Sequence, residues 1–366
     1  MVSRLAAGLH MGHLAGMITR RSFLTQVAAA SVAAPAFAQA AKKKIKLGYD
    51  NFAVRAMGWK APQLLDYAVQ LKCDTLFISD IESYESLEDA ALMEFRKKAD
   101  AAGVALYAGG WSICPTSTSF KPKWGTAEEH LRLGLRIARA LGSPVYRVVL
   151  GAAPDRKTEG GIRARIADMV KVLKVCRTQA VDAGIKVAVE NHAGDMHSWE
   201  LRDLIEEAGK DFVGANLDSG NAAWTLEDPH EALEILGPYT VCSSLRDDMI
   251  WETPDGSSIA WTAAGEGLMD WKKYVARWSA LCPKVPIHIE TISGFSRNFP
   301  HKTEAFWKDY EKRPETFAKF QAMAKRGKPL PNFKAANRED EQKFQKGELE
   351  RSLKYLREVV GLGVKA

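Results

Sequence analysis

The sequence predicts a (β/α)8 barrel, the TIM-barrel architecture, with a C-terminal helical extension. Three observations predict it. Eight short apolar segments recur from residue 45 onward, amphipathic segments of helical length separate them, and the apolar segments lack the strict alternation of half-exposed strands. Strands without alternation that are spaced by helices indicate a parallel sheet covered on both faces. Eight such units over about 250 residues are what a closed barrel requires.

The eight apolar segments are the predicted barrel strands. They cover residues 45–50, 75–80, 104–109, 145–150, 186–191, 212–218, 240–245 and 287–290. Several of the helical patterns between them end at a glycine, which is typical of the position just after a helix. An open, doubly wound sheet is the alternative, but no Gly-x-Gly-x-x-Gly follows the first strand, and this favours the barrel.

Residues 1–38 differ from the rest of the chain, because they contain no Asp, Glu or Lys. Arg20 and Arg21 precede a mildly apolar run that meets an Ala-x-Ala pattern ending at Ala38. This order predicts a twin-arginine signal peptide and export to the periplasm or another extracytoplasmic space. Met1 and Met17 both remain candidates for the true start.

Two further stretches lie outside the barrel, which is predicted over residues 45–291. Residues 246–268 predict a long loop with a hairpin at Asp255-Gly256, a strong turn signal. Residues 292–366 are polar and aromatic, then highly charged, and end in a helical pattern. They predict a C-terminal helical extension that packs on the barrel or on a neighbouring subunit, so a homo-oligomer is compatible with the sequence.

Charge and cysteine content limit the possible partners and compartments. Removal of the three arginines in residues 1–38 lowers the formal net charge from +6 to +3, which is too small to indicate nucleic acid or an anionic membrane as partner. No apolar stretch approaches the roughly 20 residues of a spanning helix, so no membrane insertion is expected after signal removal. The five cysteines show no Cys-x-x-Cys or zinc spacing, and we expect buried free thiols.

Four of the predicted strands end on acids that suit a functional site: Asp80, Glu190, Asp218 and Glu290. In such barrels the active site lies at the carboxyl ends of the strands, so these acids are functional candidates. We expect Glu190, Asp218 and Glu290 to converge. Three carboxylates near one axis repel strongly unless a cation joins them, and an oxygen-rich set suits Mn²⁺ or Mg²⁺ better than Zn²⁺.

Side chains alternate between the two faces of a strand, so each neighbour of these acids can be assigned to a face. His192 shares a face with Glu190, whereas Asn191 points to the opposite face. By the same rule His288 lies on the face of Glu290, and Asn216 on the face of Asp218. His192 is then either a substrate-facing hydrogen-bond donor or a satisfied neighbour of the site. His197 and His230 stand near helix starts and are expected at the surface or as caps.

Five segments carry a resemblance to a known family. V-A-V-E-N-H, N-L-D-S-G-N, S-S-L-R-D-D, G-E-G-L-M-D-W and P-I-H-I-E-T occur in this order, and they resemble the sugar phosphate isomerase/epimerase superfamily of xylose-isomerase-like barrels. The likeness covers roughly residues 45–291. It implies that Glu190, Asp218 and Glu290 are metal ligands, and that Glu190 and Glu290 also act as catalytic acid and base on opposite faces of the substrate carbon.

The sequence departs from the family pattern at two positions. Ser244 stands where the family has a metal-binding His, and Asn221 stands where a substrate-binding His is expected. Ser244, a water, Asp247 or His288 could complete the metal shell. Arg246 occupies the family's Lys position and is predicted to bind a hydroxyl or carboxylate of the substrate as a bidentate donor.

Aromatic and basic side chains complete the predicted site. Trp111 and Trp224 follow the third and sixth strands, and we expect them to bind the substrate by stacking on its sugar ring. Trp251 and Trp261, in the long loop, are candidates for the same role. Arg147 lies inside the fourth strand, where a buried charge needs a partner, so it either pairs with a barrel acid or faces an anionic substrate group.

These residues predict a divalent-metal-dependent isomerase or epimerase. It acts on a non-phosphorylated or oxidised (keto) carbohydrate by α-proton abstraction through an enediolate, which a metal and nearby charges stabilise. The same abstraction could instead expel a glycosidic oxygen, which describes a lyase acting on keto-glycosides. A non-catalytic carbohydrate-binding barrel is the alternative of another class. A nuclease of the related apurinic-endonuclease type requires more histidines than the predicted strand ends supply.

Overall fold

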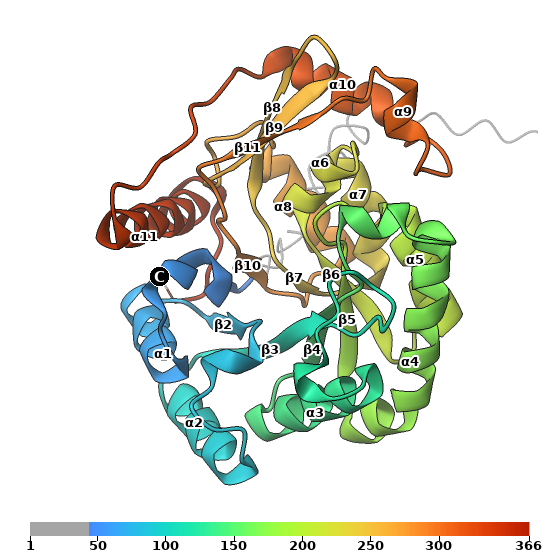
Figure 1. The fold of residues 1–366 in the computed structure, drawn as a ribbon. Coiled ribbons are helices and arrows are strands. Elements are labelled where there is room, and N and C mark those ends of the chain that lie inside the picture. Colours follow the sequence, from blue (N-terminus) through green and yellow to red (C-terminus); the bar gives the residue numbers. More distant parts are fainter. Residues whose placement is uncertain (1–43, 366) are drawn as a thin grey trace, which may run out of the picture. The chain divides into compact units, whose positions relative to one another are not determined.

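The computed structural model describes residues 44–365 (Figure 1). The predicted twin-arginine signal, residues 1–38, lies outside the described residues and stays a prediction.

Eight parallel strands form the barrel, in the order β10-β1-β2-β3-β4-β5-β6-β7. Their bounds are β1 Leu47–Asp50, β2 Thr75–Ile78, β3 Ala105–Ser112, β4 Val145–Val149, β5 Lys186–Glu190, β6 Val213–Leu217, β7 Thr240–Ser243 and β10 Ile287–Ile289. A parallel bridge between Leu245 and Ile289 joins β7 to β10, and the Leu245 N–H donates to the His288 carbonyl at 2.8 Å. The predicted barrel is therefore confirmed.

Helices lie outside the strands, as Figure 1 shows for the blue-to-green part of the chain. They are α1 Ala61–Gln70, α2 Asp89–Ala101, α3 Ala127–Leu141, α4 Gly161–Ala183, α5 Ser198–Ala208, α6 Ser219–Trp224, α7 Pro229–Leu236 and α8 Trp271–Leu281. Helix α3 illustrates the local signals. Thr126 and Glu129 cap its start reciprocally, and Gly142 ends it with φ +68, a left-handed conformation that suits glycine.

A second, antiparallel sheet of three strands stands at the carboxyl side of the barrel, at the top of Figure 1. Strands β8 (Asp247–Glu252) and β9 (Ser257–Thr262) form the predicted hairpin, which closes between Thr253 and Gly256. Strand β11 (Ser296–Phe299) pairs with β9. The extension was predicted as helical, so β11 corrects that prediction: its backbone groups complete the free edge that β9 would otherwise expose.

The remainder of the C-terminal part is helical, as predicted. It contains α9 Glu304–Trp307, α10 Phe317–Arg326 and α11 Arg338–Tyr355, followed by a π-helical turn over Leu356–Val360. It packs on the barrel. The Gln345 side chain accepts the Ala56 N–H at 2.8 Å, and the Asp74 carboxylate accepts the N–H groups of Leu47, Val364 and Lys365 at 2.8 to 2.9 Å.

All five cysteines are buried free thiols, as predicted. Burial raises the pKa of Cys73 and of Cys282 to about 12, so both remain protonated and unreactive at neutral pH. Among residues 44–365, none of the helices combines the length and the apolar character that crossing a membrane requires.

Candidate functional site at the carboxyl end of the barrel

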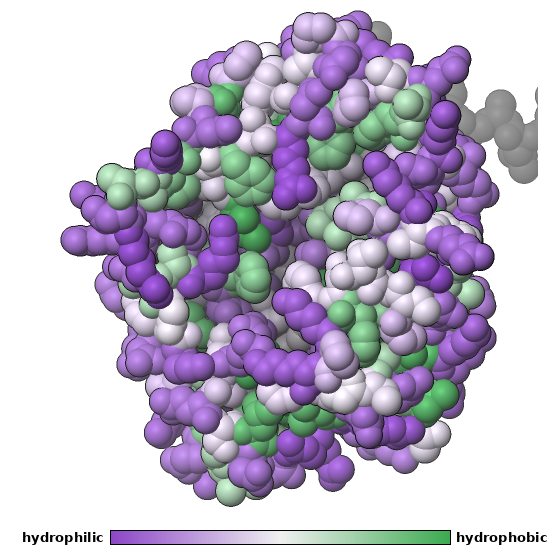
Figure 2. Space-filling model, in the orientation of Figure 1, coloured by the Kyte–Doolittle hydropathy of each residue, from purple (hydrophilic) through white to green (hydrophobic). Residues whose placement is uncertain are grey.

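A cavity of about 330 Å³ opens at the carboxyl ends of the strands. Figure 2 shows this face of the molecule hollowed near its centre. The residues that line the cavity include Trp111, His192, Asn221, Trp224, Arg246, Trp261 and Glu290. All five residues predicted to bind substrate therefore lie at one cavity, together with one of the two predicted catalytic glutamates.

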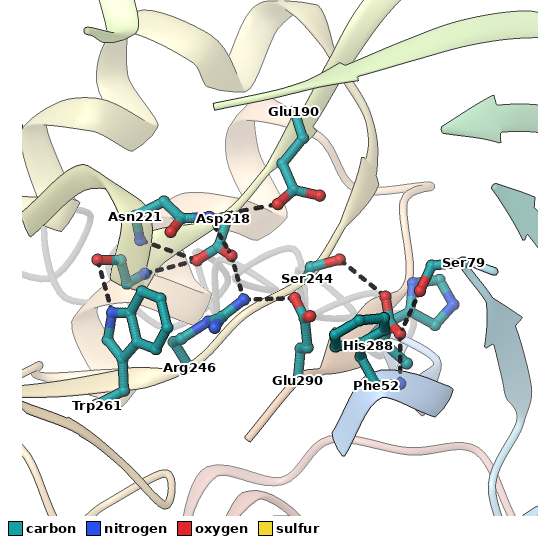
Figure 3. A network of polar contacts seen from close by, with 12 residues as sticks. Phe52, Ser79, Glu190, Asp218, Asn221, Ser244, Arg246, Trp261, His288 and Glu290 are labelled. Atoms are coloured by element: carbon teal, nitrogen blue, oxygen red, sulfur yellow. Dashed lines mark hydrogen bonds and ion pairs between the residues drawn. The ribbon is translucent and has the colours of Figure 1, made fainter. Parts of the chain in front are cut away.

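Three buried carboxylates converge beside this cavity (Figure 3). Glu190 ends β5, Asp218 follows β6 and Glu290 follows β10. One oxygen from each lies within 4.8 Å of the others, and each residue is at most 3% exposed. The structure thus places the three acids together, as the strand-end pattern predicts.

The fourth strand-end acid, Asp80, does not join the triad. It follows β2, caps a short 3-10 helix that spans Ile81–Ser83, and lines a separate, adjoining cavity.

Glu190 is paired with a buried arginine. Its Oε2 accepts a bond from Nε of Arg147 at 2.6 Å and one from Nδ2 of Asn216 at 2.9 Å. Nδ2 of Asn221 lies 3.3 Å from the other oxygen, Oε1. Arg147 also donates to the Gly110 carbonyl at 2.8 Å. Of the two alternatives for Arg147, the structure therefore has it paired with a barrel acid.

Asp218 and Glu290 share a second buried arginine. Nη2 of Arg246 donates to a carboxylate oxygen of each, so the guanidinium lies between the two acids (Figure 3). Asp218 also accepts the backbone N–H groups of Gly220 and Asn221, at 2.8 and 3.0 Å, which cap α6. Nε and Nη1 of Arg246 have no hydrogen-bond partner among the described residues.

The two glutamates differ in the direction of their pKa shifts. Burial alone would raise the pKa of Glu190, but the charge of Arg147 and its hydrogen bond outweigh it, and the pKa lies below its ordinary value. Burial raises the pKa of Glu290 well above its usual range despite Arg246. Burial likewise raises the pKa of Asp218 to about 7. The pKa values of the two glutamates are thus shifted in opposite directions, a separation typical of acid and base pairs.

The donor set fits a hard divalent cation in type and spacing. Three carboxylate oxygens within 4.8 Å can reach a common cation after small side-chain movements. Arg246 already supplies positive charge to two of them. A metal and this guanidinium would therefore compete for the same oxygens.

The candidates for a fourth ligand differ in availability. The Asp247 carboxylate accepts four N–H groups, from Asp248, Gly265, Met269 and the Trp271 indole. His288 lies deeper in the barrel against Phe77 and Tyr107. Ser244 is bonded to Asn216 at 3.2 Å and to Asp50 at 3.4 Å. Ser244 is thus the candidate that shares the hydrogen-bond network of Glu190.

His192 lines the cavity in its neutral form. Burial lowers its pKa, although Glu190 opposes the shift. Its Nδ1 lies 2.6 Å from the Gly151 carbonyl, which can only accept, so Nδ1 carries the proton. Nε2 is then free to accept a hydrogen bond. This makes His192 an acceptor for a hydroxyl, whereas the sequence left it as either a hydrogen-bond donor to the substrate or a satisfied neighbour of the site.

An aromatic stack forms one wall of the cavity. The rings of Trp224 and Trp261 stack at 4.3 Å with an interplanar angle of 11°. Arg246 lies over Trp261 at 4.2 Å, and Arg297 of β11 lies over Trp224 at 4.4 Å. We call these four side chains the cation–aromatic stack. Trp251, also a candidate for stacking on the sugar ring, instead packs in a separate apolar cluster with Met249 and Ala260.

Sequence reasoning missed two residues of this region. Asp50 ends β1, is fully buried and accepts the Ser79 hydroxyl at 2.6 Å, and burial raises its pKa to about 6. The rule that selected Glu190 could have found it, because it also ends a predicted strand. Arg297 carried no such signal, since it lies in the extension that was predicted as helical.

Comparisons with known proteins identify the family and the fold. A family model described as xylose isomerase-like TIM barrel matches residues 53–305. The chain is 21% identical over 210 residues to 3-oxo-isoapionate decarboxylase of Pectobacterium atrosepticum, covering 57% of this chain and 69% of the relative.

Solved structures agree on the fold. A D-psicose 3-epimerase in the presence of D-fructose superposes with a TM-score of 0.57 at 16% identity, over 87% of this chain and 100% of that one. The 3-keto-D-glucoside 4-epimerase from E. coli superposes with a TM-score of 0.52 at 14% identity, over 77% of this chain and 99% of that one. The IOLI protein with a binding zinc atom superposes with a TM-score of 0.54 at 13% identity, over 78% of this chain and 100% of that one. At these identities the likeness concerns the fold alone.

Proposed function

The chain belongs to the xylose isomerase-like TIM barrel family, and we propose that it is a divalent-metal-dependent isomerase or epimerase. Its substrate would be a non-phosphorylated or oxidised (keto) carbohydrate, and the reaction would move the proton on the carbon beside a carbonyl group. The similar structures support this proposal, because they include epimerases of D-psicose and of a 3-keto-D-glucoside.

The observation that carries the proposal is the convergence of Glu190 and Glu290 from two different strand ends, with one carboxylate oxygen of each within 4.8 Å of the other. Glu190 is held by Arg147, whose charge lowers its pKa, while Glu290 lines the cavity and burial raises its pKa. A substrate carbon between them would lose its proton to Glu190 and receive one from Glu290. Removal of a proton and its return from another direction inverts that carbon, which is the outcome of an epimerase.

Other residues prepare the cavity for this proton transfer. Arg147 keeps Glu190 ionised, and Asn221 donates to both Glu190 and Asp218. Glu190, Asp218 and Glu290 are the side chains that would hold the metal. When bound, a divalent cation would stabilise the negative charge that develops on the substrate's carbonyl oxygen.

The test is the exchange of solvent deuterium into candidate sugars with added Mn²⁺, followed by NMR. The panel contains D-fructose, D-psicose and 3-keto-D-glucosides. We expect deuterium at the carbon beside the carbonyl, and at least a ~100-fold loss of exchange in Glu190→Gln and in Glu290→Gln. The matched control is Glu234→Gln, an exposed glutamate of α7. Exchange that persists in both site variants, or no exchange in any sugar, would refute the proposal.

A further inference from the structure

We infer that a second cavity beside the site binds another sugar ring, so that the substrate is a glycoside and not a free monosaccharide. This inference rests on the proposed function, because it extends the carbohydrate site by one subsite. It also favours keto-glycosides among the oxidised carbohydrates considered above.

The second cavity adjoins the first. Its volume is about 220 Å³, and Phe52 and Trp111 line both cavities. Its other walls come from the end of β2, the end of β3 and the loop that precedes α3, and include Asp80, Gly110, Trp124 and His130. A ligand that extends past Trp111 from the site cavity would therefore enter this second space.

Two tryptophans give this cavity aromatic surfaces held in place. The Trp111 indole donates to the Ser119 carbonyl at 2.8 Å, and its ring meets the edge of His192. Lys121 lies over the ring of Trp111 at 5.5 Å, and Lys123 lies over Trp124 at 5.3 Å. Sugar rings present C–H groups on one face, and fixed aromatic rings with a few polar groups around them are typical of small-molecule sites.

A buried histidine without a partner lines the cavity. His130 is 2% exposed, and neither of its ring nitrogens makes a hydrogen bond of good geometry among the described residues. Burial lowers its pKa, although the backbone of Ser112 is near enough to oppose the shift. A buried polar group without a partner costs about 1–3 kcal/mol, and a sugar hydroxyl would supply the missing partner.

Gly110 leaves room for the side chains of Tyr146 and His130 at this wall of the cavity. A Cβ at this position would come within 2.1 Å of the Tyr146 hydroxyl and 3.1 Å of Nε2 of His130. The Tyr146 hydroxyl is itself buried and has no partner among the described residues. The Tyr146 hydroxyl and the His130 ring, both without a partner among the described residues, thus lie together beside Gly110.

The charges around the cavity favour a neutral ligand. Asp80 and Glu82 are balanced by Lys121 and Lys123, and Lys123 pairs with Glu82. The balance leaves no excess positive charge for a phosphate group. One oxygen of Asp80 caps the next turn by accepting the Glu82 N–H at 3.0 Å, and the other remains available to a hydroxyl. Carboxylates can accept hydrogen bonds from the hydroxyl groups of a sugar ring, lysine side chains can donate to them, and the aromatic rings can contact its C–H groups.

The experiment compares one-ring and two-ring probes on the full chain with Mn²⁺. The probes are 3-keto-D-glucose, and the 3-keto forms of trehalose and cellobiose. Binding is measured by calorimetry and deuterium exchange by NMR. We expect at least one of the two-ring probes to bind about tenfold more tightly than 3-keto-D-glucose. Trp124→Ala and Asp80→Asn should each remove that advantage while leaving the one-ring affinity unchanged, whereas Met93→Ala, at an exposed position of α2, should change neither.

Asp80→Asn guards against a folding defect, because it keeps the side-chain oxygen that caps the turn. Equal binding of one-ring and two-ring probes, or binding of none of them, would overturn the inference. An equal loss for both kinds of probe in Trp124→Ala and Asp80→Asn would do the same. The proposed function fails separately, when probes bind but no deuterium enters them. If deuterium enters the one-ring and two-ring probes equally well, the proposed function stands and the subsite does not.

Discussion

Two buried ion-pair clusters, one at the end of β5 and one at the start of α5, differ in how completely their polar atoms are paired. The site cluster contains Glu190, Asp218, Glu290, Arg147 and Arg246. It has three acids for two arginines, and two nitrogens of Arg246 have no partner among the described residues. It also borders the larger cavity through Arg147, Arg246 and Glu290.

The junction cluster contains Arg156, His197 and Glu200. Arg156 donates to both oxygens of Glu200, to Nδ1 of His197 and to the Gly194 carbonyl, and its guanidinium lies 4.4 Å over the ring of Tyr310. One acid meets one arginine here, and each nitrogen of that arginine has a partner.

The comparison teaches that burial of charge does not by itself mark a functional site. Both clusters are buried, yet in the junction cluster one arginine meets one acid, and of its side-chain polar atoms only Nε2 of His197 lacks a partner among the described residues, which suits a role in joining α5 to the C-terminal part. The site cluster has three acids for two arginines, two nitrogens of Arg246 without a partner among the described residues, and access to a cavity. A buried ion-pair cluster is a candidate ligand site when its charged groups lack hydrogen-bond partners and it borders a cavity. Burial alone does not distinguish such a site from a cluster with a structural role.

The largest predicted effect is the loss of free energy of unfolding in Arg156→Met, which tests the structural role of the junction cluster. The substitution leaves Glu200 buried without its cation, and removal of one partner of a buried pair costs about 3–5 kcal/mol. Urea unfolding followed by circular dichroism measures this loss. Arg277→Met is the control, because its pair with Glu234 is exposed and is worth less than about 1 kcal/mol. Equal losses in the two variants would refute the assigned role.

The next largest predicted effect is a change in the affinity for Mn²⁺ when Arg246 is replaced. Arg246→Met removes the guanidinium that holds Asp218 and Glu290, so a cation no longer competes with it for their oxygens. We expect Mn²⁺ to bind the variant roughly 10- to 100-fold more tightly than the wild type. A neighbouring charge changes the affinity of a carboxyl for a proton by about one to three powers of ten, and it should act on Mn²⁺ in the same sense. Calorimetry with Mn²⁺ alone measures the affinity.

Arg277→Met again serves as the control for the Mn²⁺ measurement and should leave the affinity unchanged. If Arg246→Met bound Mn²⁺ no more tightly than the wild type, the guanidinium would not be a competitor. If neither protein bound Mn²⁺, the metal itself would be excluded from the proposed function.

The smallest effect is a pH dependence in the junction cluster. Burial lowers the pKa of His197 to about 4, below its unfolded value near 6.5. The neutral histidine therefore stabilises the fold fully above pH 6.5, and this stabilisation falls as the pH drops toward 4. Between pH 7 and pH 5 the loss from this group is about 2 kcal/mol.

His197→Phe keeps an aromatic ring against Trp199 but cannot titrate. Its free energy of unfolding should therefore fall by about 2 kcal/mol less than that of the wild type between pH 7 and pH 5. Urea unfolding at the two pH values measures the difference. His192 and His288 titrate in both proteins, so their contributions cancel. Identical pH profiles would contradict the assignment.

The parts of the fold and site that follow from local patterns could be predicted. Each barrel strand appears within a few residues of its predicted position, because buried strands and capped helices leave short, repeated signals. Glu190, Asp218 and Glu290 were identified for the same reason: each ends a strand, and strand ends in a barrel meet at one rim.

What could not be predicted depends on contacts between distant segments. Nothing near Arg246 in the sequence shows that its side chain turns back onto Asp218 and Glu290. His197 was expected at the surface or as a cap, and it does precede α5, but it is fully buried. Its burial comes from Trp199 and Tyr310, which contact its ring from two sides. Strand β11 likewise has no pattern of its own and exists because β9 offers an edge.

The cation–aromatic stack has an evolutionary consequence. Its two tryptophans and Arg297 come from α6, β9 and β11, so two of its three sources lie outside the barrel repeat, while the carboxylates they face belong to the barrel itself. A lineage could exchange the hairpin and the C-terminal part and so reshape what the cavity admits, while the acids stay in place. Selectivity and chemistry are in this way encoded in separable stretches of one chain.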